Sequence, residues 1–312
     1  MTQVFIDGSH GTTGLRIQER LTGRTDLTLS ILPEALRKDP EARREALNAA
    51  DIAILCLPDA ASRESVSLIT NPKTVVLDAS TAHRTAPGWA YGFPELGPEF
   101  ERRIRTGRRI AVPGCHASGF IALAEPLVAA GILPKTAQLA CYSLTGYSGG
   151  GRKMIAQYEA EGRSVLLDAP RIYGLAQTHK HLPEMKAVTG LESAPVFLPV
   201  VGDFYSGMLV TIPLVPSMLA DGRGIEDVRA ALRAQYRGPV VNYVESADEE
   251  GFMASNALSG LDTMQVTVFG NPDRFVLAAR FDNLGKGASG AAIECLNLVL
   301  GSDPAAGLKL GR

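Results

Sequence analysis

Short apolar runs alternate with helical patterns through the first hundred residues, and this alternation limits the possible folds more than any other feature. The apolar runs are Val4–Ile6, Leu27–Leu32, Ile52–Leu57 and Val75–Leu77. The helical patterns begin at Thr13 and then span Glu41–Ala50 and Ala60–Ile69. Strands that alternate with helices form a parallel sheet. We therefore predict an α/β domain of the Rossmann type, with a further strand at Ile110–Val112.

The strands change in character after Pro134. They become longer and richer in β-branched residues, which favours a mixed, largely antiparallel sheet. These runs are Gln138–Leu144, Val196–Val201, Met208–Val215, Val240–Val244, Met264–Phe269 and Phe275–Phe281. Helices are expected over Phe120–Ala130, Lys153–Glu161, Ile225–Tyr236 and Ala288–Leu300, and after Pro183. Because 312 residues exceed what one core usually accommodates, we predict two domains, the second of the α+β class.

The composition excludes several functional classes. Hydrophobic residues make up 46% and charged residues 21% of the chain, as in ordinary globular proteins. The formal net charge is −2, and no cluster of basic residues stands out along the chain. A nucleic-acid partner is therefore not expected. No targeting segment and no long apolar run is visible, so we expect a cytoplasmic protein without a membrane partner. The four cysteines form no CxxC pair, which argues against a disulfide framework or a zinc knuckle.

A glycine-rich segment follows the first strand directly and opens the first helix. Residues 7–14 read D-G-S-H-G-T-T-G, a GxxGxxG spacing at the first βα junction. Glycines there let the backbone approach a pyrophosphate, whose charge the helix N-terminus then holds. A tight turn without a ligand is the alternative, but the position favours a dinucleotide. The candidate contacts are Gly8, His10, Gly11, Thr12, Thr13 and Gly14.

The end of the second strand bears on which dinucleotide binds. An NAD site usually has an acidic side chain there, whereas this strand ends at Leu32-Pro33 and is followed by Arg37-Lys38. This pattern favours NADP. Glu34 weakens the inference, and the two cations are also consistent with a solvated helix end.

Cys115 follows Pro113-Gly114 and precedes an apolar helix. A helix N-terminus lowers a thiol pKa and favours the nucleophilic thiolate. By contrast, Cys56, Cys141 and Cys295 lie in apolar segments and are expected to be inert core residues. Cys115 is therefore the candidate nucleophile, with a buried small residue at a turn as the alternative.

Two histidines, His179 and His181, lie one residue apart just before Pro183. Histidine is the usual proton carrier near neutral pH, so either is a candidate general acid or base. An HxH pair is also compatible with a metal, but no third ligand with suitable spacing is visible, and no metal is expected. His10, His83 and His116 have weaker claims and are interpreted as local hydrogen-bonding residues or parts of a cofactor loop.

The segment Tyr147–Lys153 reads Y-S-G-G-G-R-K and joins a strand to a helix. Glycines with two cations suit an anionic substrate such as a phosphate, although a hinge with exposed charges fits the same residues. Asp78–Arg84 and Tyr91–Glu95 follow the fourth strand, at the sheet edge that usually faces ligands.

Together these motifs resemble the N-acetyl-gamma-glutamyl-phosphate reductases, within the wider aspartate-semialdehyde dehydrogenase superfamily, and the compact length is similar to the family's short form. The matching pieces are Gly8–Gly14, Cys56–Pro58, Asp78–Arg84, Tyr91–Leu96, Pro113–Cys115, Tyr147–Lys153, His179–His181 with Pro183-Glu184, and Asp282–Ala288. Two departures are Val112, where the family more often has Asn, and Gly285, which replaces a bulkier residue.

The resemblance implies roles for particular residues. Cys115 would be the nucleophile, His179 or His181 the acid/base, and Asn283 with Gly285 would lie near the nicotinamide. The implied substrate contacts are Arg152, Ser148, Gly149, Glu184 and Arg84. The expected cofactor contacts beyond the glycine loop are Arg37, which follows the second strand, and Cys56, Leu57, Pro58, Ser80, Asn283 and Gly285. The final helix would fold back onto the cofactor domain, giving a dinucleotide-binding domain of 1–115 and 282–312 and a catalytic and oligomerisation domain of 116–281.

The implied reaction is the NADPH-dependent reduction of N-acetyl-L-glutamyl 5-phosphate to the 5-semialdehyde through a thioester on Cys115. A homodimer or homotetramer is expected from the resemblance alone. Two alternatives stay open. The same chemistry could act on aspartyl phosphate or on an aminoadipyl phosphate held by an acidic carrier protein, although the near-neutral chain disfavours the carrier. A nucleotide-binding sensor without turnover would use Cys115 only for packing.

Overall fold

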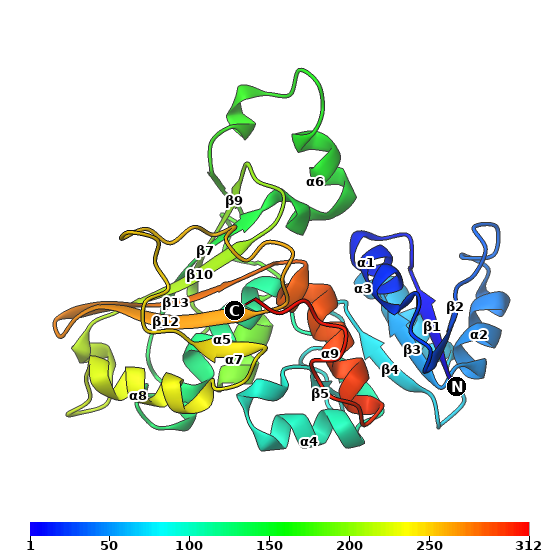
Figure 1. Ribbon diagram of the computed structural model, residues 1–312, viewed down its shortest axis with the longest axis horizontal. Coiled ribbons are helices and arrows are strands. Elements are labelled where there is room, and N and C mark those ends of the chain that lie inside the picture. Colours follow the sequence, from blue (N-terminus) through cyan, green and yellow to red (C-terminus); the bar gives the residue numbers. More distant parts are fainter. Residues whose placement is uncertain (312) are drawn as a thin grey trace. The chain divides into compact units, whose positions relative to one another are not determined.

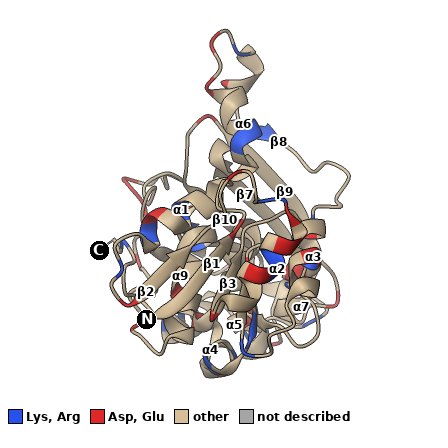
Figure 2. Cartoon of the chain, turned by 90° about the vertical axis from the view of Figure 1, so that its right-hand side faces the viewer, with Lys and Arg blue, Asp and Glu red and all other residues tan. Residues whose placement is uncertain are grey.

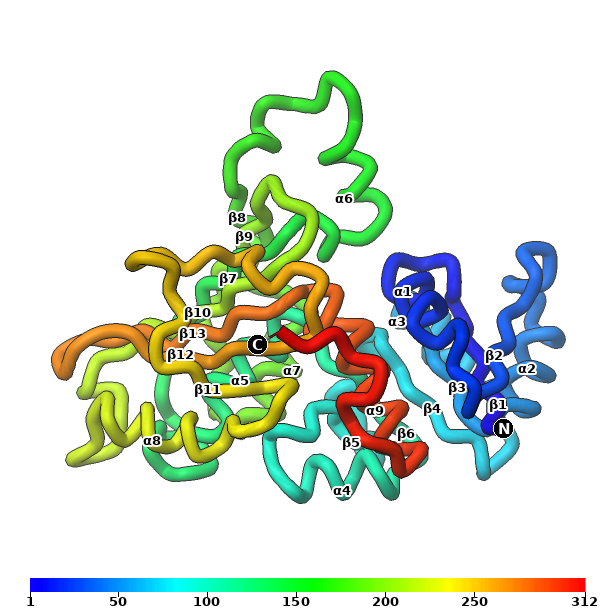
Figure 3. The backbone as a smooth tube through the Cα atoms, in the orientation of Figure 1, coloured from blue at the N-terminus to red at the C-terminus, as the bar shows by residue number. Residues whose placement is uncertain are grey.

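The computed structural model describes residues 1–311, and the chain folds into two compact units. The first unit comprises residues 1–94, 98–114 and 288–308. The second comprises residues 95–97 and 115–287 and the chain from Lys309 on. Figure 1 labels the elements of both units, and in Figure 3 the red C-terminal helix α9 (Gly290–Val299) can be followed back to the cyan elements of the first unit.

The first unit is built on a parallel sheet with the strand order β2-β1-β3-β4-β6-β5. Its strands are β1 (Thr2–Asp7), β2 (Leu27–Ser30), β3 (Ile52–Leu55), β4 (Val75–Asp78), β5 (Ala90–Tyr91) and β6 (Arg109–Ala111). Its other helices are α1 (Thr12–Leu21), α2 (Pro40–Ala49), α3 (Asp59–Leu68) and α4 (Pro98–Thr106). Every strand pair in this sheet is parallel. The predicted Rossmann-type fold is therefore confirmed.

Successive residues of β1 pack on opposite faces of this sheet. Val4 and Ile6 belong to the core on one face, with Ile17 of α1 and Leu296 of α9. Phe5 belongs to the core on the other face, which α2 covers. A strand buried on both faces has no polar side, which is why β1 reads as an uninterrupted apolar run. Helices α2 and α3 carry charges of both signs (Figure 2), including the exposed ion pair of Arg44 with Glu41 on α2.

The second unit is built on a mixed sheet with the strand order β11-β12-β13-β10-β7-β9-β8. Its strands are β7 (Ala140–Gly146), β8 (Arg171–Ile172), β9 (Val196–Gly202), β10 (Met208–Leu214), β11 (Val241–Tyr243), β12 (Met264–Asn271) and β13 (Arg274–Phe281). Its helices are α5 (Cys115–Ala129), α6 (Gly151–Tyr158), α7 (Leu182–Thr189) and α8 (Ile225–Gln235). The pairs β7–β9 and β11–β12 are parallel and the other pairs are antiparallel. The predicted mixed, largely antiparallel sheet is confirmed.

Helix α5 lies against this sheet and is the most buried helix of the second unit. It contacts β10 and β13 on one side and helices α7 and α8 on others. Residues Ala117–Ala124 are all buried, as expected for a helix that is apolar all round. The approach is so close that a Cβ at Gly119 would lie 2.4 Å from Cγ2 of Val210 on β10. α5 begins at Cys115, five residues before the predicted start of the helical pattern.

Three short elements were not expected from the sequence: β5, α4 and β8. Helix α4 buries only Ile104, and five of its nine residues are charged, so it has no continuous apolar stripe to detect. The boundary between the units also differs from the expected one. Cys115 belongs to the second unit because it is part of α5, and residues 282–287 stay there because Asp282 and Asn283 bond to the loops at Gly260 and Gly207.

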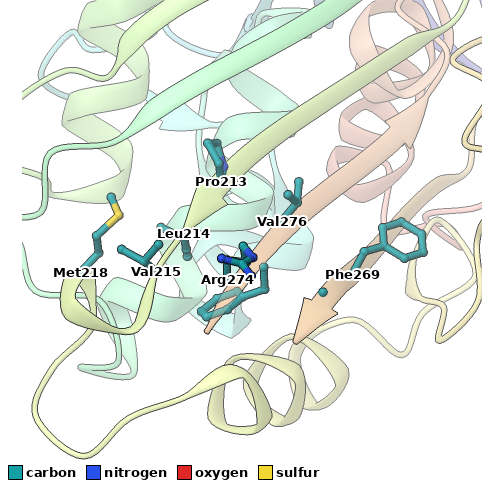
Figure 4. A pocket seen from close by; sticks show the side chains of 9 residues that line it. Pro213, Leu214, Val215, Met218, Phe269, Arg274 and Val276 are labelled. Carbon is teal, nitrogen blue, oxygen red and sulfur yellow. The ribbon is translucent and has the colours of Figure 1, made fainter. Parts of the chain in front are cut away.

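One face of the mixed sheet carries exposed apolar side chains. Tyr142 on β7, Val196 on β9 and Val276 on β13 are exposed, while their neighbours along each strand point into the core. At one end of this face lies an apolar hollow of about 400 Å³ (Figure 4). It is lined by Pro213, Leu214, Val215, Met218, Phe269, Gly270, Arg274, Phe275 and Val276. No helix in the described part of the chain is long and apolar enough to cross a membrane.

We predict that Gly119→Ala lowers the free energy of unfolding. The added methyl would overlap Val210, and overpacking of a core typically costs about 1–3 kcal/mol, more than the helix propensity that alanine gains over glycine. Urea unfolding followed by circular dichroism measures the change.

The Val210→Ala variant is the matched control for this contact. It should destabilise the wild-type background more than the Gly119→Ala background, because in the latter it also relieves the overlap. Equal losses in both backgrounds would contradict the close packing of α5 on β10.

Candidate active site

The glycine loop follows β1 at the point where the strand order reverses, between β1 and β3. Gly8 has a φ of 88°, and a Cβ there would lie 2.4 Å from the carbonyl oxygen of Cys56. A Cβ at Gly14 would lie 2.4 Å from the Gly8 carbonyl oxygen, whereas one at Gly11 would meet only ordinary contacts. Gly8 and Gly14 therefore serve the turn and the packing, and Gly11 leaves the backbone open to a ligand. This division fits a pyrophosphate on the loop.

Helix α1 begins directly at this loop, with Gly11 as its N-cap and Thr12 and Thr13 in its first turn. Within the described residues no side chain caps the helix at Gly11, so the amides of the first turn keep their capacity for an anion. His10 and Arg37 both contact Glu34, with Nε2 of His10 3.0 Å and Nε of Arg37 2.6 Å from its two carboxylate oxygens. The acidic side chain and the cation beyond β2 thus lie beside the glycine loop together.

The segment Cys56–Pro58 lies beside the same loop, as the resemblance implied. The amide of Cys56 donates to the Asp7 carbonyl oxygen at 2.8 Å, and its own carbonyl lies over Gly8. Pro58 is the N-cap of α3. Burial, with the nearby carboxylates of Asp78 and Asp7, raises the pKa of the Cys56 thiol to about 12. Cys56 therefore contributes its backbone to the surroundings of the glycine loop, and its thiol stays protonated.

A buried hydrogen-bond cluster follows β4. The carboxylate of Asp78 is fully buried and accepts from the amide and hydroxyl of Ser80, with His83 Nδ1 at 2.6 Å. Arg84 donates from Nε to the Val112 carbonyl at 2.9 Å, just before Pro113-Gly114. The predicted residues Ser80 and Arg84 therefore lie at one edge of the first unit, where they hold its loops.

Cys115, which the sequence places just before an apolar helix, is the first residue of α5, and it is partly exposed. Gly287, in the π-helical segment that begins at Gly285, packs behind it, and a Cβ at Gly287 would lie 3.0 Å from the Cys115 Cβ. The first-turn position places the thiol in the field of the helix N-terminus, which favours thiolate. By contrast, burial raises the pKa of the Cys141 thiol, which lies inside β7.

His116 lies next to Cys115 and makes two short hydrogen bonds. Its Nδ1 is 2.6 Å from the hydroxyl of Ser143 on β7, and its Nε2 is 2.6 Å from the hydroxyl of Tyr173. Its ring packs edge-on to Phe197, with the centroids 5.3 Å apart. Burial, and to a smaller extent His179, lowers the pKa of His116 to about 3. His116 is therefore a neutral imidazole at physiological pH.

The two predicted histidines lie close to His116, with ring centroids 5.6 Å away for His179 and 5.7 Å away for His181. The amide of His181 donates to Nδ1 of His179 at 3.2 Å. Burial, with the charge of Lys180, lowers the pKa of His179 to about 4, so this ring is also neutral. His181 precedes α7, whose first turn carries the buried Glu184. The structure therefore gathers Cys115, both predicted histidines and His116 in one region of the second unit.

The predicted anion-binding segment forms the 3-10 turn Tyr147–Gly150 and the start of α6. Asn283 connects it to the rest of the unit, because its Nδ2 donates to the Ser148 hydroxyl at 3.0 Å and its Oδ1 accepts from the Gly207 amide at 2.9 Å. Gly149 lies against the same amide. Arg152 is exposed and makes no ion pair within the described chain. Ser148, Gly149 and Asn283 are thus brought together, with Arg152 one helical turn further on.

Glycine at position 285 is a packing requirement, since a Cβ there would lie 2.1 Å from the Leu261 carbonyl oxygen. The next residue, Lys286, is buried and places Nζ 2.7 Å from both carboxylate oxygens of Glu95. This ion pair fixes the segment 95–97 to the second unit, on the turn that backs Cys115.

Sequence reasoning missed Ser143 and Tyr173 and gave His116 little weight. The position of His116, directly after the candidate nucleophile, was a usable signal. Ser143 and Tyr173 are 28 and 58 positions from Cys115 (143 − 115 and 173 − 115), and only the pairing of the strands brings them to α5. No local pattern could have identified them.

Comparison with known families defines the class of protein. The protein-family model for "Semialdehyde dehydrogenase, NAD binding domain" matches residues 4–102. The family model for "Semialdehyde dehydrogenase, dimerisation domain" matches residues 115–283. A solved structure of aspartate semialdehyde dehydrogenase II from Vibrio cholerae superposes with a TM-score of 0.73 at 17% identity, covering 96% of this chain and 98% of that one. The two units thus have the fold of the semialdehyde dehydrogenases, with a domain for a nicotinamide cofactor.

Two curated relatives narrow the class. N-acetyl-gamma-glutamyl-phosphate reductase 2 of Pseudomonas putida is 46% identical over 304 residues, which cover 96% of this chain and 97% of that protein. N-acetyl-gamma-glutamyl-phosphate reductase of Sinorhizobium medicae is 48% identical over 305 residues, covering 96% and 98%. The chain belongs to the N-acetyl-gamma-glutamyl-phosphate reductase family.

We predict that a thiol reagent modifies Cys115 before the other cysteines. Brief treatment of the native protein with iodoacetamide near neutral pH should label Cys115 alone, because thiols whose pKa is raised, such as Cys56 and Cys141, stay protonated there. The thiolate form of Cys56 should become abundant, and the residue reactive, only as the pH approaches about 12. Peptide mass spectrometry reads the sites, and urea-unfolded protein, in which all four cysteines should react, is the control. Equal labelling of Cys56 and Cys115 in the native protein would contradict the assignment.

Proposed function

We propose that this protein catalyses the NADPH-dependent reduction of N-acetyl-L-glutamyl 5-phosphate to N-acetyl-L-glutamate 5-semialdehyde, with release of phosphate, as a step of arginine biosynthesis. The observation that carries the proposal is the position of Cys115 on the first turn of α5, beside His116 and near His179 and His181. The chain's membership of the reductase family supports the identity of the substrate. The proposed activity would take place in the cytoplasm.

The proposed reaction begins with attack of the Cys115 thiolate on the acyl carbon of the substrate. The carbon–oxygen bond to phosphate breaks, phosphate leaves, and a thioester remains on Cys115. When bound, the nicotinamide supplies the hydride that reduces the thioester carbonyl. The resulting oxyanion then collapses, the carbon–sulfur bond breaks, and the aldehyde and the Cys115 thiolate are released. Overall, the reaction consumes one acyl phosphate, one hydride and one proton.

The residues around Cys115 suit the proton and charge requirements of these steps. His179 or His181 would take up and deliver the proton as an imidazolium. In its neutral form His179, whose Nδ1 accepts from the His181 amide, presents an Nε2–H that can donate a hydrogen bond. Arg152 and the Ser148–Gly149 turn would bind the anionic groups of the substrate. Glu184 and Arg84 stay predicted substrate contacts. Backbone amides at the start of α5 would stabilise the oxyanion.

The glycine loop, the segment Cys56–Pro58 and Ser80 would hold the dinucleotide, and Asn283 with Gly285 would lie near its nicotinamide ring. Arg37 supports NADP rather than NAD, because a guanidinium beyond β2 suits a 2′-phosphate. Glu34 opposes that preference, but its carboxylate is already matched by His10 and Arg37. Arg37 is the residue we expect to select NADP.

We predict turnover in the reverse direction. Purified protein with N-acetylglutamate semialdehyde, inorganic phosphate and NADP should form NADPH, and NAD in place of NADP should give a lower kcat/KM. Cys115→Ser should lower the rate at least about a thousandfold, as loss of a covalent nucleophile does. Cys141→Ala, which removes a buried thiol from β7, is the control and should retain the rate. Full activity of Cys115→Ser would remove the thioester route, and no NADPH formation by the wild type would remove the proposed function.

We also propose that two copies pair through the open face of the mixed sheet, as a homodimer or within a homotetramer. The exposed apolar residues Tyr142, Val196 and Val276 support this face, because such a surface is costly to leave in water.

We expect sedimentation velocity to give at least twice the chain mass of 33.1 kDa. Val276→Lys should dissociate the assembly by placing a charge in the apolar contact. Val165→Lys, which alters a more exposed valine away from the strands, should leave it intact. A monomeric wild type, or dissociation by Val165→Lys alone, would contradict the proposed face.

A further inference from the structure

His116 is hydrogen-bonded on both ring nitrogens by hydroxyl groups, and a neutral imidazole can donate from only one of them. Either Nδ1 donates to Ser143 and Nε2 accepts from Tyr173, or Ser143 donates to Nδ1 and Nε2 donates to Tyr173. The two arrangements have the same heavy-atom distances. They differ at the Tyr173 hydroxyl. In the first arrangement it donates its proton to His116, and in the second it accepts from His116 and keeps its proton for another acceptor.

The surroundings of Ser143 favour the second arrangement. Its side chain is fully buried on β7, and His116 is its one hydrogen-bond partner within the described residues. If Ser143 accepted from Nδ1, its own O–H would be a fully buried donor without an acceptor, which is destabilising. If Ser143 donates, the hydroxyl without an acceptor in the chain is that of Tyr173, a partly exposed residue that can donate to water or a ligand, and Ser143 itself leaves only a lone pair unpaired. Ser143 should therefore donate to Nδ1, leaving the proton on Nε2.

An Nε2–H on His116 makes Tyr173 the acceptor in their contact. The proton of the Tyr173 hydroxyl then remains to be donated elsewhere, and within the described residues the structure gives that hydroxyl no other partner. Burial raises the pKa of the Tyr173 phenol, and so does the charge of Cys115. The phenol thus stays protonated and lies within electrostatic range of the candidate nucleophile.

We propose that Ser143 and His116 are positioning residues that fix Tyr173 as a hydrogen-bond donor to the acyl oxygen of a substrate held on Cys115. Negative charge develops on that oxygen when a nucleophile or a hydride adds to the carbonyl, and a donor aimed at it stabilises the transition state. No proton is transferred in this role. The inference rests on the proposed function for the identity of the acyl group, but the tautomer of His116 does not depend on it.

The packing around the histidine restricts it to this role. His116 is enclosed by Phe197 on one side and by His179 and His181 on others. Tyr173 also contacts the small core of Tyr158, Leu167 and Val201, which orients its ring. The titratable groups whose rings contact His116 are His179 and His181, from the segment before α7, and Tyr173. With its pKa near 3, His116 stays neutral at physiological pH, and its tautomer is the variable that matters.

The tautomer can be observed directly in the protein without substrate. Long-range proton–nitrogen spectra of protein labelled with ¹⁵N-histidine distinguish Nε2–H from Nδ1–H, and the chain has only five histidines to resolve. The His116 signals are those that disappear in His116→Phe. We expect the Nε2–H form in the wild type and a shift toward Nδ1–H in Ser143→Ala. An Nδ1–H wild type would overturn the proposal, whatever the substrate is.

Kinetics test the consequence for the reaction. Tyr173→Phe should lower kcat by about 100-fold with little change in KM, the usual effect of losing one oxyanion donor. Ser143→Ala should lower kcat by about tenfold, because Tyr173 then donates part of the time to His116 instead. In the Tyr173→Phe background Ser143→Ala should have no further effect, whereas losses that multiply would overturn the proposal.

Tyr142→Phe is the matched control, since Tyr142 precedes Ser143 on β7 and its side chain points to the opposite face of the sheet. It should retain the wild-type kcat. If the wild type does not turn over the acyl substrate, the proposed function fails, and the spectra still decide the tautomer.

Discussion

The packing of α5 against the mixed sheet is the constraint on which the candidate site depends. Gly119 allows the helix to touch Val210, and the Tyr236 hydroxyl donates to the Ala122 carbonyl at 2.7 Å from the far side. A helix held on several sides cannot rotate without opening the core. Its first two residues, Cys115 and His116, therefore have fixed directions, and the reactive end of the site is set by the best-packed part of the second unit.

Much of the fold could be predicted because local patterns and tertiary structure agree. Strands buried on both faces give continuous apolar runs, and β1 with its glycine loop shows both the period and the turn chemistry of a dinucleotide-binding unit. The assignment of Cys115 to a helix start also held, because Pro113-Gly114 ends one element and an apolar helix follows. These features depend on residues close together in the sequence.

The rest of the site depends on residues that are far apart in the sequence, which is why sequence reasoning missed it. Ser143 meets His116 only because β7 lies beside β10, on which α5 packs. Tyr173 reaches His116 only because β8 pairs with β9. The charged helix α4 and the two-residue strands β5 and β8 carry no period long enough to detect. The roles of Arg152 and of either catalytic histidine remain predictions, since their contacts with a substrate are not part of the chain's own geometry.

The shortness of β8 has a consequence for how the site behaves in solution. Only Arg171 and Ile172 pair with β9, at the edge of the sheet, and Tyr173 follows them directly. A pairing of two residues at an edge has little free energy opposing local opening, so its amides should exchange with solvent long before those of α5. The rigid and the compliant parts of the site therefore meet at the contact between His116 and Tyr173. A substrate that binds there would order the edge strand, and the conformational entropy lost in that ordering would consume part of the binding energy.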